Sequence, residues 1–157
     1  MEILYGQINP KKAPLWLLSL VVVMPTFFAF LATSSSNAAL MHIAGSFGST
    51  ADEAKWVVTS YMIANGIFLP LTGWLERTLG RLNFLKIFIS IFTVGSVVCS
   101  FAPSLLVLII GRIIQGVGGG VLMPLSQSIL LQEFPENRKG DAMAIFVFSI
   151  MVSSIMG

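Results

Sequence analysis

Charged residues are scarce in this chain of 157 residues. Asp, Glu, Lys and Arg together make up 10% of the sequence, whereas hydrophobic residue types make up 55%, and the mean hydropathy is +0.89. Soluble domains carry roughly 25% charged residues, so this composition excludes an ordinary soluble domain, and we expect no nucleic-acid partner. The sequence therefore predicts an integral membrane protein whose main surroundings are the lipid bilayer.

Cysteine and histidine each occur only once, as Cys99 and His42. A single cysteine excludes an internal disulfide and leaves no basis for a metal cluster, so we expect no metal and no cofactor. A membrane enzyme would need paired acids, a nucleophile with its base, or a metal cluster within the spans. The apolar runs contain none of these, so the sequence predicts no catalytic residue and no enzyme activity.

Five long apolar runs account for most of the chain. They are too long and too unbroken to be strands of a transmembrane barrel, which alternate in polarity over about ten residues. The predicted fold class is therefore an all-α membrane protein, formed by five transmembrane helices of an N-terminal bundle. The predicted helices cover about residues 15–41, 54–75, 83–102, 104–131 and 139–157.

The two ends of the chain lead to separate expectations. Residues 1–14 are predicted to form a cytoplasmic N-terminal segment. Lys11, Lys12 and the apolar run after them also imitate a signal peptide, but that run is long for one and more membrane spans follow it. The last run reaches Gly157 without a charged flank. We therefore expect residues 15–157 to be the N-terminal bundle of a longer protein, truncated at 157.

The placement of basic residues predicts an orientation. Of the nine Lys and Arg residues, seven precede the first run or fall around the second and fourth connections, whereas the first connection carries only Lys55. Short cytoplasmic loops are enriched in Lys and Arg. The sequence therefore predicts a multi-pass protein of the cell (inner) membrane with a cytoplasmic N-terminus.

The remaining basic residue, Arg112, lies inside the fourth apolar run. A charge near the middle of a membrane helix costs ~2.5 kcal/mol or more on insertion scales, and no acidic residue lies in any other run. Arg112 must therefore be held by carbonyls, hydroxyls, water or a part of the protein outside this chain. It is the first functional candidate.

A polar patch near the outer end of the first run offers such acceptors. The patch, Thr33 to Asn37, consists of three serines flanked by a threonine and an asparagine. Small polar residues can simply allow close helix packing, but the patch can also face a watery cavity at the depth of Arg112. We take as candidate residues for substrate binding and coupling Arg112, Gln115, Thr33, Ser34 and Asn37.

The fourth run contains the pattern L-x-x-x-R-x-x-Q-G-x-G-G-G, formed by Leu108, Arg112, Gln115, Gly116, Gly118, Gly119 and Gly120. This pattern resembles the fourth-helix signature of the major facilitator superfamily. The segments 56–61, 70–75 and 134–144 are similar to its fourteen-helix drug/proton antiporter branch, the EmrB/QacA type. The resemblance covers nearly the whole chain from about Phe28 onward.

The resemblance also marks residues of conformational change and two departures. The superfamily's cytoplasmic motif, G-x-L-a-D-r-x-G-r-k, is met at Gly73, Gly80 and Arg81, but Arg77 stands at its aspartate position. Ala32 stands where the first-helix motif has the aspartate that is the family's implied proton carrier. The resemblance thus implies conformational roles for Gly73, Arg77, Gly80, Arg81, Gly116 and Gly120, and it leaves Arg112 without an acidic partner on the first helix.

What the resemblance implies about function is a proton-coupled multidrug exporter that works by alternating access. Its implied partners are small hydrophobic or cationic drug-like substrates, protons, the missing C-terminal helices and, as a further candidate, a periplasmic adaptor protein. Two alternatives stay open. One is an exporter of a metabolite or siderophore in the same superfamily, and the other is a truncated membrane module that transports nothing.

Overall fold

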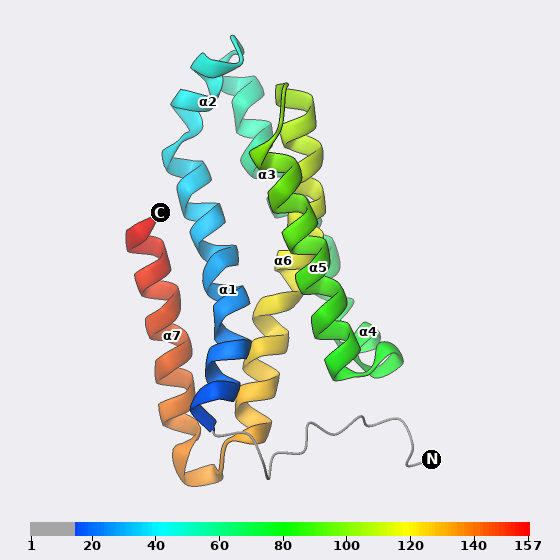
Figure 1. The fold of residues 1–157 in the computed structure, drawn as a ribbon, viewed down its shortest axis with the longest axis vertical. Helices are drawn as coiled ribbons and strands as arrows, with labels where there is room; N and C mark the ends of the chain where they lie inside the picture. Colours follow the sequence, from blue (N-terminus) through cyan, green and yellow to red (C-terminus); the bar gives the residue numbers. More distant parts are fainter. Residues whose placement is uncertain (1–14) are drawn as a thin grey trace.

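The computed structural model describes residues 15–157, which form a bundle of helices without a strand (Figure 1). The predicted cytoplasmic segment 1–14 lies outside the described residues. The all-α prediction is confirmed for the range described. In chain order the elements are α1 (Leu15–Ala38), α2 (Leu40–Ser46), α3 (Ala51–Phe68), α4 (Thr72–Leu79), α5 (Arg81–Ser100), α6 (Leu105–Glu133), the 3-10 helix η1 (Glu136–Arg138) and α7 (Lys139–Met156).

Helix α6 is the central element of the bundle. It packs against α5 and α3 along much of its length and also contacts α1 and α7 (Figure 1). Ser104 is the N-cap of α6 and has an extended backbone conformation. Its side-chain Oγ accepts a hydrogen bond from the backbone N–H of Val107 in the first turn. Pro135 follows the end of α6, and the residue before a proline avoids helical geometry. These signals make α6 a single helix of 29 residues.

Four segments are long and apolar enough to cross a membrane, as judged within the described residues. They are Ser19–Ala38, Asn83–Ser100, Leu105–Glu133 and Glu136–Met156. The bounds of α1, α5, α6 and α7 agree with the predicted helices to within three residues. The second predicted helix, about residues 54–75, is not among these four segments, because the 18 residues of α3 include the charged side chains Asp52, Glu53 and Lys55.

The predicted single helix 54–75 is two helices in the structure. Helix α3 ends at Phe68, and α4 begins at Thr72. Between them Pro70 has no backbone N–H to donate, and the chain makes tighter bonds, from the N–H of Leu71 to the carbonyl of Phe68 and from Thr72 to Leu69. The proline therefore ends α3 and sets α4 off as a separate short helix.

The first connection, predicted as a loop from about residue 42, contains the short helix α2 and a well-formed start of α3. The Thr50 side chain accepts a hydrogen bond from the N–H of Glu53, and the Glu53 carboxylate accepts one from the N–H of Thr50. This reciprocal pair is a capping box. The bonds from Thr50 favour the ionised carboxylate, so they lower the pKa of Glu53.

Glycines on two sides of α6 allow neighbouring backbones to come unusually close. Towards α5, a Cβ atom at Gly118 would lie 2.7 Å from the backbone nitrogen of Phe92. Towards α3, a Cβ at Gly116 would lie 2.6 Å from the carbonyl oxygen of Tyr61. Both distances are too short for a real side chain, so the glycines set how near α3 and α5 can lie to α6.

We predict that Gly118→Ala destabilises the complete protein by about 1–3 kcal/mol, because the added methyl group meets backbone and forces α5 away from α6. The measurement is the midpoint of thermal unfolding in detergent. Gly140→Ala is the matched control, since a Cβ there meets nothing within 4 Å in the described structure. Equal midpoints for the two variants would contradict the close-packing role of Gly118.

Candidate functional site

The Arg112 side chain is buried inside the bundle, with 6% of its surface exposed. Its Nη1 donates to Oε1 of Gln115 at 2.6 Å, and its Nη2 donates to the carbonyl oxygen of Ala32 on α1 at 3.0 Å. The guanidinium carbon also lies 5.7 Å from the centre of the Tyr61 ring on α3. Arg112 therefore connects α6 to α1 through a backbone carbonyl and to α3 through an aromatic ring, and the Gln115 amide on α6 itself holds the guanidinium in place.

Gln115 continues this contact to α5. Its Nε2 donates to the Oγ of Ser96 at 2.7 Å, and Ser96 in turn donates to the carbonyl of Phe92 at 3.0 Å. Gly95 makes the approach possible, because a Cβ there would lie 2.5 Å from the backbone nitrogen of Gln115. With Oε1 and Nε2 both engaged, the amide of Gln115 is held in one orientation towards Arg112.

All of the polar groups that meet the guanidinium are neutral. Within residues 15–157 no ion pair includes Arg112, and the ion pairs that do occur lie in the connections and at helix ends. Hydrogen bonds to neutral oxygens satisfy N–H groups but leave the charge uncompensated. The surroundings of Arg112 therefore carry a net positive charge, as the substitution of Ala32 for the motif aspartate implies.

A cavity of about 660 Å³ lies between α1, α5 and α6, beside this network. Its lining is mainly apolar, and Arg112, Gln115 and Ser96 are among its polar lining residues. Cavities of about 300–1,000 Å³ with apolar walls and a few polar groups are typical of small-molecule sites. The volume and lining can therefore hold a small hydrophobic molecule next to the guanidinium.

The structure divides the polar patch of the first helix among several surroundings. Ser35 and Ser36 line the cavity of Arg112, whereas Thr33 lines a second pocket of about 160 Å³ between α1, α3 and α6. Ser34 donates to the carbonyl of Ser154 on α7 at 3.2 Å, and Asn37 is exposed. Successive residues of a helix point about 100° apart, so five in a row cannot face one cavity.

Three partners of the network escaped sequence reasoning, namely the Ala32 carbonyl, Ser96 and the ring of Tyr61. In the sequence, Ala32 shows only that a carboxylate is missing at this position, whereas in the structure its backbone carbonyl accepts a hydrogen bond from Arg112. Ser96 follows Gly95, and a small residue beside a hydroxyl is a signal of close helix contact. That signal alone does not identify which helix the contact reaches.

We predict that Gln115→Leu destabilises the complete protein by about 1–3 kcal/mol, because it takes an acceptor from Arg112 and leaves Ser96 without its donor. Gln127→Leu on the same helix is the matched control, since no hydrogen bond of the Gln127 side chain occurs among the described residues. Thermal unfolding in detergent measures both. A Gln127 variant as unstable as the Gln115 variant would refute the role of this amide.

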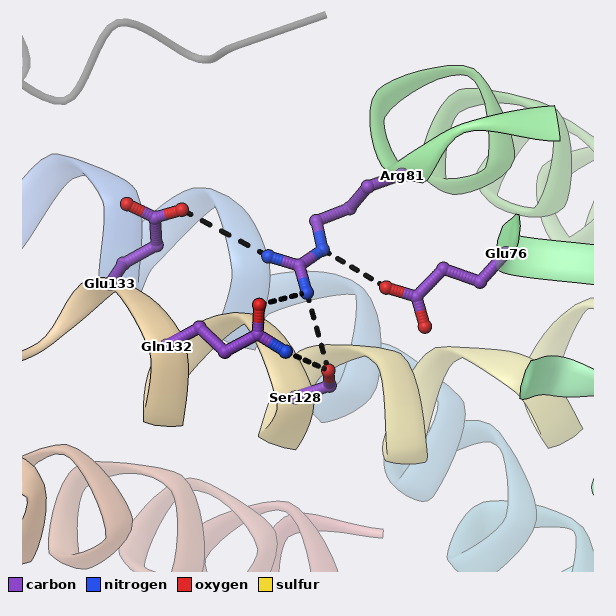
Figure 2. A network of polar contacts seen from close by, with 5 residues as sticks. All are labelled: Glu76, Arg81, Ser128, Gln132 and Glu133. Carbon is purple, nitrogen blue, oxygen red and sulfur yellow. Dashed lines mark hydrogen bonds and ion pairs between the residues drawn. The ribbon is translucent and has the colours of Figure 1, made fainter. Parts of the chain in front are cut away.

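A second polar network ties the α4–α5 turn to the end of α6, and Figure 2 shows Arg81 at its centre. Its Nε lies 3.0 Å from Oε1 of Glu76, and its Nη2 donates to Oε1 of Gln132 at 2.7 Å and to Oγ of Ser128 at 3.4 Å. Its Nη1 lies 3.9 Å from Oε1 of Glu133. Arg81 thus joins carboxylates from two segments of the chain.

The other predicted motif residues around this turn have different surroundings. Gly80 is the single residue between α4 and α5, and its φ of 76° lies in the region that favours glycine. Arg77 is exposed and belongs to no ion pair of the described residues, and a Cβ at Gly73 would meet nothing within 4 Å. Glu76, one position before Arg77, supplies the carboxylate next to Arg81.

We predict that Arg81→Ala destabilises the complete protein by about 1–2 kcal/mol, because several partly buried acceptors lose a shared cation. Arg138→Ala is the control, since within residues 15–157 Arg138 pairs only with Asp141, at 3.4 Å, and both side chains are more than half exposed. An exposed pair of this kind contributes about 0–1 kcal/mol. Thermal unfolding that ranks the two variants in the opposite order would contradict the network.

The apolar helices and the buried Arg112 network identify the chain as part of a multi-pass helical membrane protein with a polar centre. Residues 22–157 match the Major Facilitator Superfamily. Because this match covers most of the chain, the chain belongs to that superfamily of transporters. The predicted family and fold class are thereby confirmed.

Curated relatives specify the likeness further. The chain is 39% identical over 155 residues to the multidrug export protein EmrB of Haemophilus influenzae, covering 95% of this chain and 30% of that protein. It is 36% identical over 143 residues to the probable multidrug resistance protein EmrY of Escherichia coli, covering 91% and 28%. It is also 33% identical over 147 residues to the fatty acid resistance protein FarB of Neisseria gonorrhoeae, covering 94% and 29%. The chain therefore spans under a third of the length of these relatives.

Proposed function

We propose that the complete protein is a secondary active transporter that exports small hydrophobic drug-like molecules by alternating access. The observation that carries the proposal is the Arg112 network beside a cavity, in a chain similar to multidrug export proteins. Alternating access needs contacts between helices that can exist in two arrangements. A guanidinium that reaches a backbone carbonyl of another helix is such a contact.

Arg112 is proposed to act as a fixed positive charge whose partners change during transport. In the described arrangement it holds α1 through the carbonyl of Ala32. A side chain or substrate group with negative charge would form a stronger, charge-assisted bond with the guanidinium and compete with this carbonyl. Binding of a proton or substrate can then alter the position of α1 relative to α6 through this bond.

The proton carrier is proposed to lie outside residues 15–157. Ala32 cannot take up a proton, and no described carboxylate pairs with Arg112. A carboxylate from the remaining helices would complete the site and give Arg112 an acidic partner. A permanently charged guanidinium also repels cations, so hydrophobic molecules fit this cavity better than cationic ones.

The orientation and the partners complete the proposal. We place the protein in the inner membrane with a cytoplasmic N-terminus, as the distribution of basic residues predicts. The Arg81 network would then lie at the cytoplasmic surface, where Gly73, Arg77, Gly80 and Arg81 would take part in conformational change. Protons and a periplasmic adaptor protein are the proposed further partners, and no enzymatic step is included.

We predict that Arg112→Ala in the complete protein abolishes drug resistance. We expect the inhibitory concentration of the drug to fall by at least about tenfold, which corresponds to about 1.4 kcal/mol. The reason is the loss of the fixed charge and of the bond to α1. The measurement is the inhibitory concentration of a hydrophobic drug for cells producing each variant. Arg138→Ala removes an exposed arginine and serves as the control.

The amount of each variant in the membrane is measured by immunoblot in the same cells. The prediction requires that Arg112→Ala be present at the level of the unaltered protein. Unchanged resistance would remove Arg112 from the mechanism. No resistance from the unaltered protein, at normal abundance and across several drug classes, would contradict the exporter function itself.

A further inference from the structure

A second pocket lies on another side of α6 from the cavity of Arg112. It has a volume of about 160 Å³ and is formed by α1, α3 and α6. Its lining includes no charged residue and combines apolar with neutral polar side chains. The lining residues that matter here are Phe30, Thr33, Tyr61, Met62, Asn65 and Met123. A volume this small holds one end of a drug-sized molecule and not the whole of it.

Two polar groups in this pocket make no hydrogen bond to the described residues. Tyr61 is 5% exposed, and its ring faces Arg112, yet its hydroxyl has no partner within residues 15–157. The carboxamide of Asn65, also in the pocket, has none either. The Tyr61 hydroxyl and the half-buried Asn65 carboxamide are therefore open to the pocket, because no fully buried side-chain nitrogen or oxygen among the described residues lacks a partner, as is the rule in proteins. Thr26, Ser126 and Gln115 in the same bundle follow that rule.

Two glycines of α6 provide the space for these groups. A Cβ at Gly119 would lie 2.5 Å from the hydroxyl oxygen of Tyr61, and a Cβ at Gly120 would lie 2.7 Å from Oδ1 of Asn65. A residue larger than glycine at either position would press on the polar group. The glycines thus have two roles. They allow the helices to pack closely, and they leave room for the Tyr61 hydroxyl and the Asn65 carboxamide beside the pocket.

We propose that this pocket is a substrate subsite that takes a neutral hydrogen-bonding group, such as an amide, carried on an apolar body. The Tyr61 hydroxyl donates to the carbonyl oxygen of such a group, and the Asn65 carboxamide accepts from its N–H. Phe30, Met62 and Met123 contact the apolar part, and methionine adapts to ligands of different shape. The inference rests on the proposed function, because the ligand is taken to be an exported molecule.

The test uses two probes with the same skeleton of non-hydrogen atoms, N-(1-naphthyl)acetamide and 1-isobutylnaphthalene, in which the amide nitrogen and oxygen of the first are carbon atoms in the second. Binding to the purified complete protein is measured by calorimetry. We expect the unaltered protein to bind the amide more tightly than the hydrocarbon. Tyr61→Phe removes only the hydroxyl, so the amide should lose about fivefold in affinity, the factor of one ordinary hydrogen bond, while the hydrocarbon keeps its affinity.

Asn65→Leu is the second variant, with the same expected loss for the amide alone. Thr59→Val is the control, because it removes a hydroxyl from an exposed position of the same helix and should alter neither affinity. Equal binding of both probes by the unaltered protein, or an amide affinity unaffected by both pocket variants, overturns the subsite. The resistance assay decides the proposed function separately, since a protein that exports drugs can still lack this subsite.

Discussion

Close backbone approach along α6 is the constraint on which the rest of the bundle depends. Gly118 lets α5 approach on one side, and Gly116 lets α3 approach on another, each at a distance that excludes a Cβ. At these separations Gln115 reaches Ser96, and the ring of Tyr61 lies beside Arg112. The same glycine run therefore fixes both the packing of the helices and the positions of the polar side chains between them.

Burying Arg112 without an acid shapes the chemistry of the site. The guanidinium is satisfied by a carbonyl and an amide, so its hydrogen bonds are made while its charge remains. A buried charge of this kind strongly favours any arrangement that brings a negative group near it. No carboxylate of residues 15–157 pairs with Arg112, so a negative group beside it would have to come from a ligand or from outside the described residues.

The sequence predicts the helices better than it predicts their mutual orientation. Hydropathy locates α1, α5, α6 and α7 because each must fill the apolar thickness of a membrane. It does not reveal the break at Pro70, since membrane helices tolerate proline when neighbours satisfy the backbone. Arg112 and Gln115 are predictable as a pair because residues three apart share a face. Ser96 and Tyr61 are not, because the rotation of α5 and α3 about their axes depends on contacts far apart in the chain.

In the Arg81 network, the carboxylate next to Arg81 does not come from the residue at the aspartate position of the motif. The superfamily motif has its aspartate where Arg77 stands, and Arg77 is exposed. The carboxylate beside Arg81 comes instead from Glu76, and Glu133 of α6 adds a second one (Figure 2). Because Gly80 turns the chain sharply between α4 and α5, Arg81 folds back over the end of α4 and can meet a carboxylate one residue earlier. The geometry of the turn thus gives an ion pair between Glu76 of α4 and Arg81 of α5, although Arg77 stands at the aspartate position of the motif.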